Sequence, residues 1–427
     1  MILVFVIVLG ILGWANARIG KSVLYPPALF STLWTVLMFT LFLCGGFFDR
    51  ISEETLMIYL LGAVMFSLGG LLILRFSRGI DVSHGSPTRY QQAFLRHVID
   101  ITIAVLFLAF PFYWMRLQRL SMMHGIGVEF YTGLRMQTAT DVPRDQAFGM
   151  FGYLTALATF ATFTSFYMDD GSRAQRTRFF TLAAITLTYH LFSAARSGAI
   201  VLIFGLIGMA SLRAGRLRIK TLIIGLIVFS LVFSIPAILL KKGGSQDQSA
   251  TENLASIAES ALVYALSGPV AFDQVVRAPD NLGETTGLTF RFFKAAAKAF
   301  DPTVVVPSGI LSFTFVPSPT NVYTMYYPYY TDFGVTGLAI IMFCLGIITT
   351  WIYKKATAYS APFVILYGLT FGSLVTSSAG ELFFTGLSFW IQAVFFTCVL
   401  CRLPFYGGRG RSSFAAALGP RSDNRLP

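Results

Sequence analysis

Charged residues are scarce in this sequence: Asp, Glu, Lys and Arg make up only 12% of its 427 residues, whereas 55% are hydrophobic. A typical soluble domain carries about twice that share of charge. Apolar runs of nearly twenty residues recur along the chain, and about twenty helical residues cross the hydrocarbon core of a bilayer. The composition therefore excludes an ordinary soluble protein and predicts an all-α, polytopic integral membrane protein.

Cysteine and histidine are also rare, with four residues of each type. All four cysteines fall in apolar segments, so we expect no disulfide framework. Cys398 and Cys401 have C-x-x-C spacing, but a lone pair inside a helix with no histidine nearby is a weak metal or redox signal. The histidines are scattered, and the sequence has no glycine-rich phosphate loop and no zinc-type spacing. We therefore expect neither a metal nor a cofactor.

The net charge of +12 does not indicate nucleic-acid binding, because the basic residues cluster in short loops between apolar segments. Lys and Arg are enriched in the cytoplasmic loops of membrane proteins. Twenty of the 32 Lys and Arg residues fall in loops that alternate to one side, and ten of the other twelve lie in the two longest loops. This distribution predicts an external N-terminus, a cytoplasmic C-terminus and an external large loop.

The hydropathy predicts about eleven membrane helices and one large insertion. Residues 1–240 form a membrane domain with eight helices, 241–332 an external loop, and 333–404 a second membrane part with three helices. Residues 405–427 are rich in Gly, Arg and Ser and are expected to be a disordered cytoplasmic tail. The helices are predicted at about 1–17, 26–48, 55–74, 98–115, 147–168, 179–192, 198–212, 221–240, 333–353, 362–376 and 382–400.

The external loop contains two helical patterns. Apolar residues recur at helical spacing over 254–266, and Gly268-Pro269 is expected to break or kink that helix. Over 288–300, phenylalanines share one face, and Arg291, Lys294 and Lys298 share another. A short basic amphipathic helix of this kind favours a membrane interface, although a solvated face on an external lobe gives the same pattern.

Arg196 is the sharpest single candidate for a functional residue, since it lies in the external turn between two short helices. Arms of about fifteen residues span roughly 22 Å, so the turn is predicted to lie below the membrane surface. A charge at that depth is costly unless it is paired or hydrated, which makes a functional role the default. The alternative is an arginine that reaches the outer headgroups. His190, one to two turns earlier, is expected to line the same region.

Other external residues form a cationic and aromatic set. Glu381 is a lone carboxylate in the last external turn, where it serves either as one half of an ion pair or as a base. Cations without a metal motif suit a lipid-linked diphosphate, because guanidinium binds phosphate oxygens bidentately. Tyrosines before the ninth helix favour interfacial anchoring or sugar stacking. The candidate binding residues are Arg116, Arg119, Arg135, Arg291, Lys294, His190, Tyr327, Tyr329 and Tyr330.

Three segments resemble a known family. They are 193–198 (SAARSG), 264–276 (YALSGPVAFDQVV) and 329–337 (YYTDFGVTG). Their order, with the large external loop between them, is similar to the O-antigen polymerase (Wzy-like), or oligosaccharide repeat-unit polymerase, family. The resemblance spans about residues 131–346.

The resemblance implies a GT-C-like glycosyltransferase of the bacterial inner membrane whose large loop lies in the periplasm. Such an enzyme moves a growing glycan from undecaprenyl diphosphate onto another lipid-linked repeat unit, without a metal. The implied partners are that lipid-linked oligosaccharide and the bilayer, with a chain-length regulator and a flippase as further candidates. Arg196 matches the arginine of the family's hairpin motif, whereas Arg135 and Arg291 match only by loop position.

Two further classes stay open at the level of sequence. The related O-antigen ligases usually carry a histidine in the large loop, and this loop has none. A transporter or flippase for lipid-linked sugars would use similar cations, but no inverted repeat is visible in the hydropathy. For a polymerase, we expect Arg196 to stabilise the departing diphosphate with help from Arg135 and Arg291. The candidate bases are Glu381, Asp332 and Asp273.

Overall fold

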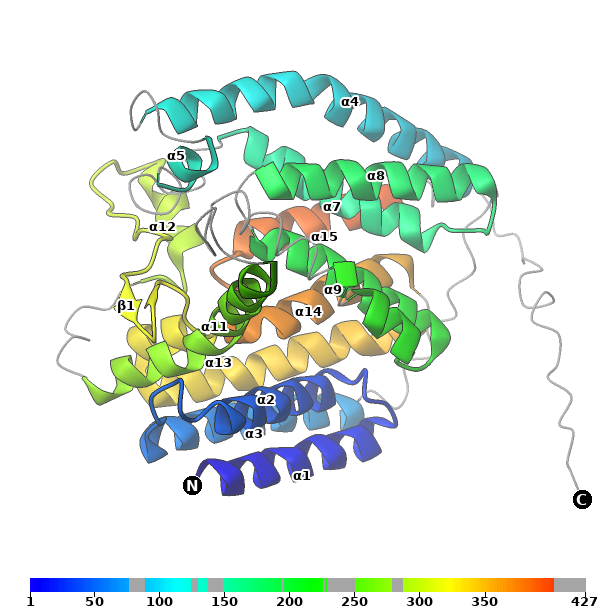
Figure 1. Ribbon diagram of the computed structural model, residues 1–427. Coiled ribbons are helices and arrows are strands. Elements are labelled where there is room, and N and C mark those ends of the chain that lie inside the picture. Colours follow the sequence, from blue (N-terminus) through cyan, green and yellow to red (C-terminus); the bar gives the residue numbers. More distant parts are fainter. Residues whose placement is uncertain are drawn as a thin grey trace, which may run out of the picture.

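The computed structural model describes residues 1–76, 89–123, 130–136, 149–192, 196–225, 227–228, 250–278, 287–358 and 360–402. Within these ranges the chain is almost entirely helical, with one antiparallel two-stranded ribbon (Figure 1). The elements are α1 (Ile2–Gly20), α2 (Pro26–Leu43), α3 (Glu53–Phe76), α4 (Arg89–Met122), α5 (Phe130–Met136), α7 (Phe151–Tyr167), α8 (Arg173–Phe192), α9 (Arg196–Ala214), α11 (Ala250–Arg277), α12 (Arg291–Lys298), β1 (Thr314–Phe315), β2 (Pro319–Thr320), α13 (Tyr326–Thr357), α14 (Ala361–Val375), η3 (Thr376–Ser378) and α15 (Leu387–Arg402).

Six of the described helices are long and apolar enough to cross a membrane: α1, α2, α3, α9, α13 and the 92–122 part of α4. Shorter apolar helices cover 362–378 and 387–397. The predicted all-helical fold with membrane-crossing segments is therefore confirmed. The helix predicted at 221–240 lies mostly outside the described residues.

The outermost helix shows how these segments meet their surroundings. α1 leaves Leu3, Ile7, Ile11 and Trp14 exposed along one side, where a soluble protein would carry charge. Its opposite side buries Asn16, whose amide donates to the Ser67 hydroxyl of α3 over 2.8 Å. An apolar outside with polar contacts inside is the distribution expected of a helix that faces lipid.

Close backbone contact joins α3 to α13 near the centre of the molecule. A methyl group added at Gly69 would lie 2.0 Å from the Phe343 carbonyl oxygen, and one at Gly346 would lie 2.1 Å from that of Phe66. Small residues let membrane helices approach in this way, which increases dispersion contact between their backbones. The contact fixes α13 as the central helix against which the large loop is assembled.

Several of the predicted helix boundaries are wrong. α2 ends at Leu43 rather than 48, and α13 starts at Tyr326 rather than 333. α8 starts at Arg173 rather than 179 and has 20 residues, and α9 has 19, so each spans roughly 30 Å at 1.5 Å per residue. The expectation that the turn before Arg196 lies deep because its arms are short is thereby corrected. α4 also continues through Met122 instead of ending at 115.

The large loop also differs from its prediction. α11 runs without interruption through Gly268-Pro269, so the expected break is absent. The Tyr59 hydroxyl donates to the Pro269 carbonyl over 3.0 Å, and the Ser378 carbonyl packs directly against Gly268. Contacts with α3 and η3 therefore stabilise a helix that local sequence disfavours.

The helix ends segregate as the hydropathy predicts. The predicted external turns meet at one end of the bundle, where Ser52 contacts Asp273, Tyr329 contacts Glu381, and Phe290 lies 6.2 Å from Phe384 between ring centroids. In Figure 1 this end lies on the left, marked by α12, β1 and α5.

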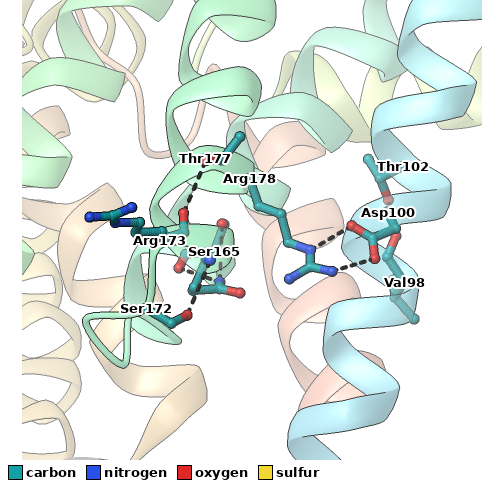
Figure 2. A network of polar contacts seen from close by, with 9 residues as sticks. Val98, Asp100, Thr102, Ser165, Ser172, Arg173, Thr177 and Arg178 are labelled. Atoms are coloured by element: carbon teal, nitrogen blue, oxygen red, sulfur yellow. Dashed lines mark hydrogen bonds and ion pairs between the residues drawn. The ribbon is translucent and has the colours of Figure 1, made fainter.

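The predicted cytoplasmic segments meet at the opposite end. Arg178 of α8 binds Asp100 of α4 through two parallel hydrogen bonds of 2.6 and 2.9 Å, and Figure 2 shows this fork. Arg96 of α4 pairs with Asp170 over 2.7 Å. The early start of α8 includes Arg178 in the helix, opposite Asp100 of α4.

Candidate functional site

The start of α13 is the point where most of the described candidate residues converge. Tyr326 is fully buried in an aromatic cluster, with ring centroids 5.1 Å from Trp34 and 5.0 Å from Tyr59. Its hydroxyl donates to the Tyr59 carbonyl over 3.1 Å. α13 then changes direction at Gly334, whose φ of 64° favours glycine. This junction joins the external loop to the first long membrane segment after it.

Glu381 is buried between η3 and α15 and accepts five hydrogen bonds. Its Oε1 accepts the Tyr329 hydroxyl at 2.6 Å and the backbone N–H of Phe383 and Phe384 at 2.6 and 2.9 Å. Its Oε2 accepts the N–H of Phe384 and Thr385 at 3.1 and 2.6 Å. A carboxylate offers about four lone-pair positions, so Glu381 is fully occupied. In this arrangement it holds the turn before α15 against α13.

Asp332 performs a similar task two residues before the kink of α13 at Gly334. Its Oδ1 accepts the N–H of Gly287 at 2.6 Å, and its Oδ2 accepts that of Thr289 at 2.8 Å. The Thr289 hydroxyl also donates to the Pro328 carbonyl over 3.1 Å. Asp332 thus holds the segment that leads into α12 against α13.

Asp273 lies on α11 and is almost completely buried. Its Oδ1 accepts the backbone N–H and the hydroxyl of Ser52, at 2.8 and 2.5 Å. Its Oδ2 pairs with the Arg277 guanidinium at 2.7 Å, and Arg277 also donates to the Arg50 carbonyl. Asp273 therefore connects the large loop to the turn between α2 and α3.

The tyrosines of this junction are packing residues in the structure. Tyr329 is fully buried, and Tyr330 makes an edge contact with Phe272 at 5.5 Å. Tyr327 stacks on Tyr323 at 4.4 Å. Burial raises the pKa of the Tyr323 hydroxyl, which stays neutral and donates to the loop carbonyl of Ser312. Interfacial anchoring and sugar stacking both need exposed ring surface, and only small parts of Tyr327 and Tyr330 offer it.

The cations of α12 lie near the Asp332 anchor. Arg291 is partly buried and donates from Nε to the Pro307 carbonyl over 2.9 Å. The Lys294 ammonium folds back over Gly287, because a methyl group at Gly287 would lie 1.9 Å from Nζ. Lys298 is exposed. The structure therefore places Arg291 and Lys294 beside the loop segment that Asp332 holds.

The structure describes the remaining predicted cations less completely. The side chains of Arg196 and Arg135 lie outside the described residues, although the backbone puts them at the start of α9 and in α5. Arg116 and Arg119 lie one turn apart near the end of α4, half-buried and exposed respectively. The convergence of these arginines on one site remains a prediction.

His190 is buried where α7, α8 and α9 meet. Its Nε2 lies 3.1 Å from the Thr159 hydroxyl, and a methyl group at Gly198 would lie 2.4 Å from the imidazole ring. The histidine therefore packs against the first turn of α9, the turn that Arg196 begins. The structure thus places His190 beside this turn, and its predicted part in a shared site with Arg196 stays a prediction.

Some residues of this region were missed by sequence reasoning. Ser52 and the backbone of 287–289 supply the donors to Asp273 and Asp332. Ser52 precedes two glutamates at the start of α3, which is typical of a helix N-terminus and gives no sign of a distant partner. Nothing in the local sequence of 287–289 indicates its contact with α13.

Among the described residues, no three His, Cys, Asp or Glu side chains lie close enough together to hold a metal ion. Cys44 and Cys344 are free thiols. No protein-family model, curated protein or solved structure matches this chain.

Proposed function

We propose that this chain is a membrane glycosyltransferase that polymerises undecaprenyl-diphosphate-linked oligosaccharide repeat units into a surface polysaccharide on the periplasmic face of the bacterial inner membrane. The observation that carries the proposal is that two of the family-like segments pack together. Segment 264–276 lies in α11, segment 329–337 crosses the kink of α13, and their residues Phe272 and Tyr330 are in edge contact.

The charges near this junction support the same chemistry. The carboxylates at the junction lie at the end of the bundle that also carries α12 and the start of α9. A prenyl diphosphate is already a good leaving group, so the enzyme must mainly neutralise its developing charge. Preorganised cations are suited to that task and require no metal.

In the proposed reaction, the acceptor hydroxyl attacks the anomeric carbon of the donor sugar as the bond from that carbon to the diphosphate oxygen breaks. The hydroxyl proton passes to a carboxylate, and undecaprenyl diphosphate leaves. Arg196 is assigned to the leaving diphosphate, with Arg135 and Arg291 as helpers. A fork of two N–H groups matches phosphate oxygens, which a lysine does not reproduce.

The base is one of three carboxylates. Glu381 is the least suited of them, because both of its oxygens are filled by hydrogen bonds. Asp332 and Asp273 would each exchange one of their donors for the acceptor hydroxyl. A base must come within hydrogen-bond reach of the proton it takes.

The test is glycan banding in a strain whose own copy is deleted and replaced by variants. Arg196→Ala is expected to lower polymer synthesis at least about 100-fold, the usual effect of losing a preorganised donor. Arg196→Lys keeps the charge but loses the fork, so it should also lower synthesis. Arg176→Ala, at an exposed site on the opposite end of the bundle, is the matched control. All variants should reach the membrane in equal amounts.

The deletion strain itself separates the classes of function. A polymerase deletion leaves single repeat units displayed outside, whereas a flippase deletion accumulates them inside and a ligase deletion leaves polymer on the lipid carrier. If the Arg196→Ala strain made polymer of normal length and amount, Arg196 would have no role in stabilising the leaving diphosphate. If every variant that removes a charge from the external turns left glycan length unchanged, the protein would instead be a structural partner of a synthase.

A further inference from the structure

The segment around α12 exposes an unusual amount of apolar surface for a part of the chain outside the long helices. Phe293 and Phe300 are 55% and 91% exposed, and the exposed set continues beyond the helix with Val305, Phe313 and Phe315. A large apolar side chain left in water forgoes the free energy that its burial would provide. Such a series on one short segment marks a surface that contacts something apolar.

The helical pattern of residues 290–300 orders this surface, with Phe290 just before α12 and Phe300 just after it. Phe290, Phe293 and Phe300 fall on one face of the pattern, and Arg291, Lys294 and Lys298 fall on the neighbouring face. A short helix with an apolar face and a basic flank lies in the plane of a membrane interface, where its cations meet lipid phosphates. A surface that binds a protein partner does not need a row of cations along one flank.

The apolar face of α12 is continuous with the membrane-facing surface of α13. Phe290 lies 5.6 Å from Phe333 between ring centroids, and Phe333 and Val335 are both exposed beside the kink at Gly334. The long apolar part of α13 starts at this kink. α12 therefore lies at the depth where a membrane helix leaves the bilayer, rather than above it.

We infer that α12 docks in the interface of the phospholipid bilayer, with the phenylalanine face of residues 290, 293 and 300 among the acyl chains and Lys298 at the level of the phosphates. The occupant of this surface is lipid, and anionic lipid suits its charge. The contact fixes the approach to Asp332, which holds 287–289, at the membrane surface. This inference does not depend on glycosyl transfer.

The test uses spin labels on the full-length protein in vesicles that contain phosphatidylglycerol. The four cysteines are replaced by serine, and single labelled cysteines are introduced as Phe293→Cys, Phe300→Cys and Ser308→Cys. Phe300 and Ser308 are exposed, so their substitution leaves the packing intact. Accessibility to oxygen, which concentrates in lipid, is compared with accessibility to a water-soluble nickel chelate.

Labels at 293 and 300 are expected to favour oxygen over the chelate by at least about threefold, and the label at 308 to show the reverse. Preference for the chelate at 293 and 300 would place the face in water and overturn the inference. Low accessibility to both reagents would show that protein covers the face, either a second copy or a partner, and would overturn it equally. A Lys298→Glu variant should move the label at 300 away from the acyl chains in anionic vesicles and leave it unchanged in zwitterionic ones.

Discussion

At the residue scale, three buried carboxylates share one physical role. Each accepts hydrogen bonds, either from groups distant in the chain or from the backbone of a turn, and the three are Glu381, Asp332 and Asp273. Glu381 holds the entry to α15, Asp332 holds 287–289, and Asp273 holds Ser52. Hydrogen bonds to a charged acceptor are about twice as strong as neutral ones. These residues therefore assemble the junction at which catalysis is proposed.

Replacement of Glu381 measures this role. Glu381→Ala leaves buried N–H groups and the Tyr329 hydroxyl without an acceptor, and should lower the free energy of unfolding by about 3 kcal/mol. Tyr329→Phe removes one donor and should cost about 1 kcal/mol. Thermal unfolding in detergent checks both. Glu53→Ala, at an exposed position of α3, is the control, and an equal effect of the control would contradict the anchoring role.

At the scale of elements, the structure is determined by close helix contacts and by the fastening of the loop to α13. The contact of α3 with α13 relies on Gly69 and Gly346, and the passage of α11 past η3 relies on Gly268. Each glycine permits a carbonyl oxygen of a neighbouring element to approach where a side chain would collide. Dispersion between backbones then replaces the hydrophobic effect, which is absent between helices in lipid.

Gly346→Ala is the direct test of the α3–α13 contact. The added methyl group would lie 2.1 Å from the Phe66 carbonyl oxygen, so one helix must shift, at a cost of about 1–3 kcal/mol. Thermal unfolding in detergent should show the loss. Gly152→Ala is the matched control, because Gly152 is helical and its new methyl group meets nothing within 4 Å. The control should be neutral or slightly stabilising, since alanine favours helix.

At the scale of the whole molecule, the described helix ends separate into two sets. One set gathers the turns around Asp273, Asp332 and Glu381. The other gathers the Arg178–Asp100 pair (Figure 2) and the Arg96–Asp170 pair. The basic loops of the second set predict that it faces the cytoplasm under the positive-inside rule, and the first set is then predicted to face the periplasm.

Reporter fusions test this assignment. A reporter inserted after Ser308 is expected to be active only as a periplasmic enzyme, and one inserted at Gly171 only as a cytoplasmic one. Both residues are exposed, so insertion should be tolerated. Activity of both reporters on the same side would contradict the topology, and exchanged sides would reverse it while preserving the helix order.

The sequence by itself determined the helical membrane class and the approximate position of most helices, and it predicts the side of the membrane on which each turn lies. Those features depend on apolar run length and on the distribution of Lys and Arg, which are local properties of the chain. The start of α13 was predicted at Phe333, where the apolar run begins, whereas the helix starts at Tyr326 and is kinked at Gly334.

Only the tertiary structure decided the length of α8, the continuity of α11 and the partners of the carboxylates. α8 begins six residues earlier than predicted, and within this added part Arg178 pairs with Asp100 of α4, 78 residues away. α11 continues past Pro269, whose carbonyl accepts a hydrogen bond from the Tyr59 hydroxyl, 210 residues away. A residue's preference for helix or turn is overridden when contacts with distant parts of the chain favour the other conformation, and a local window of sequence does not contain those partners.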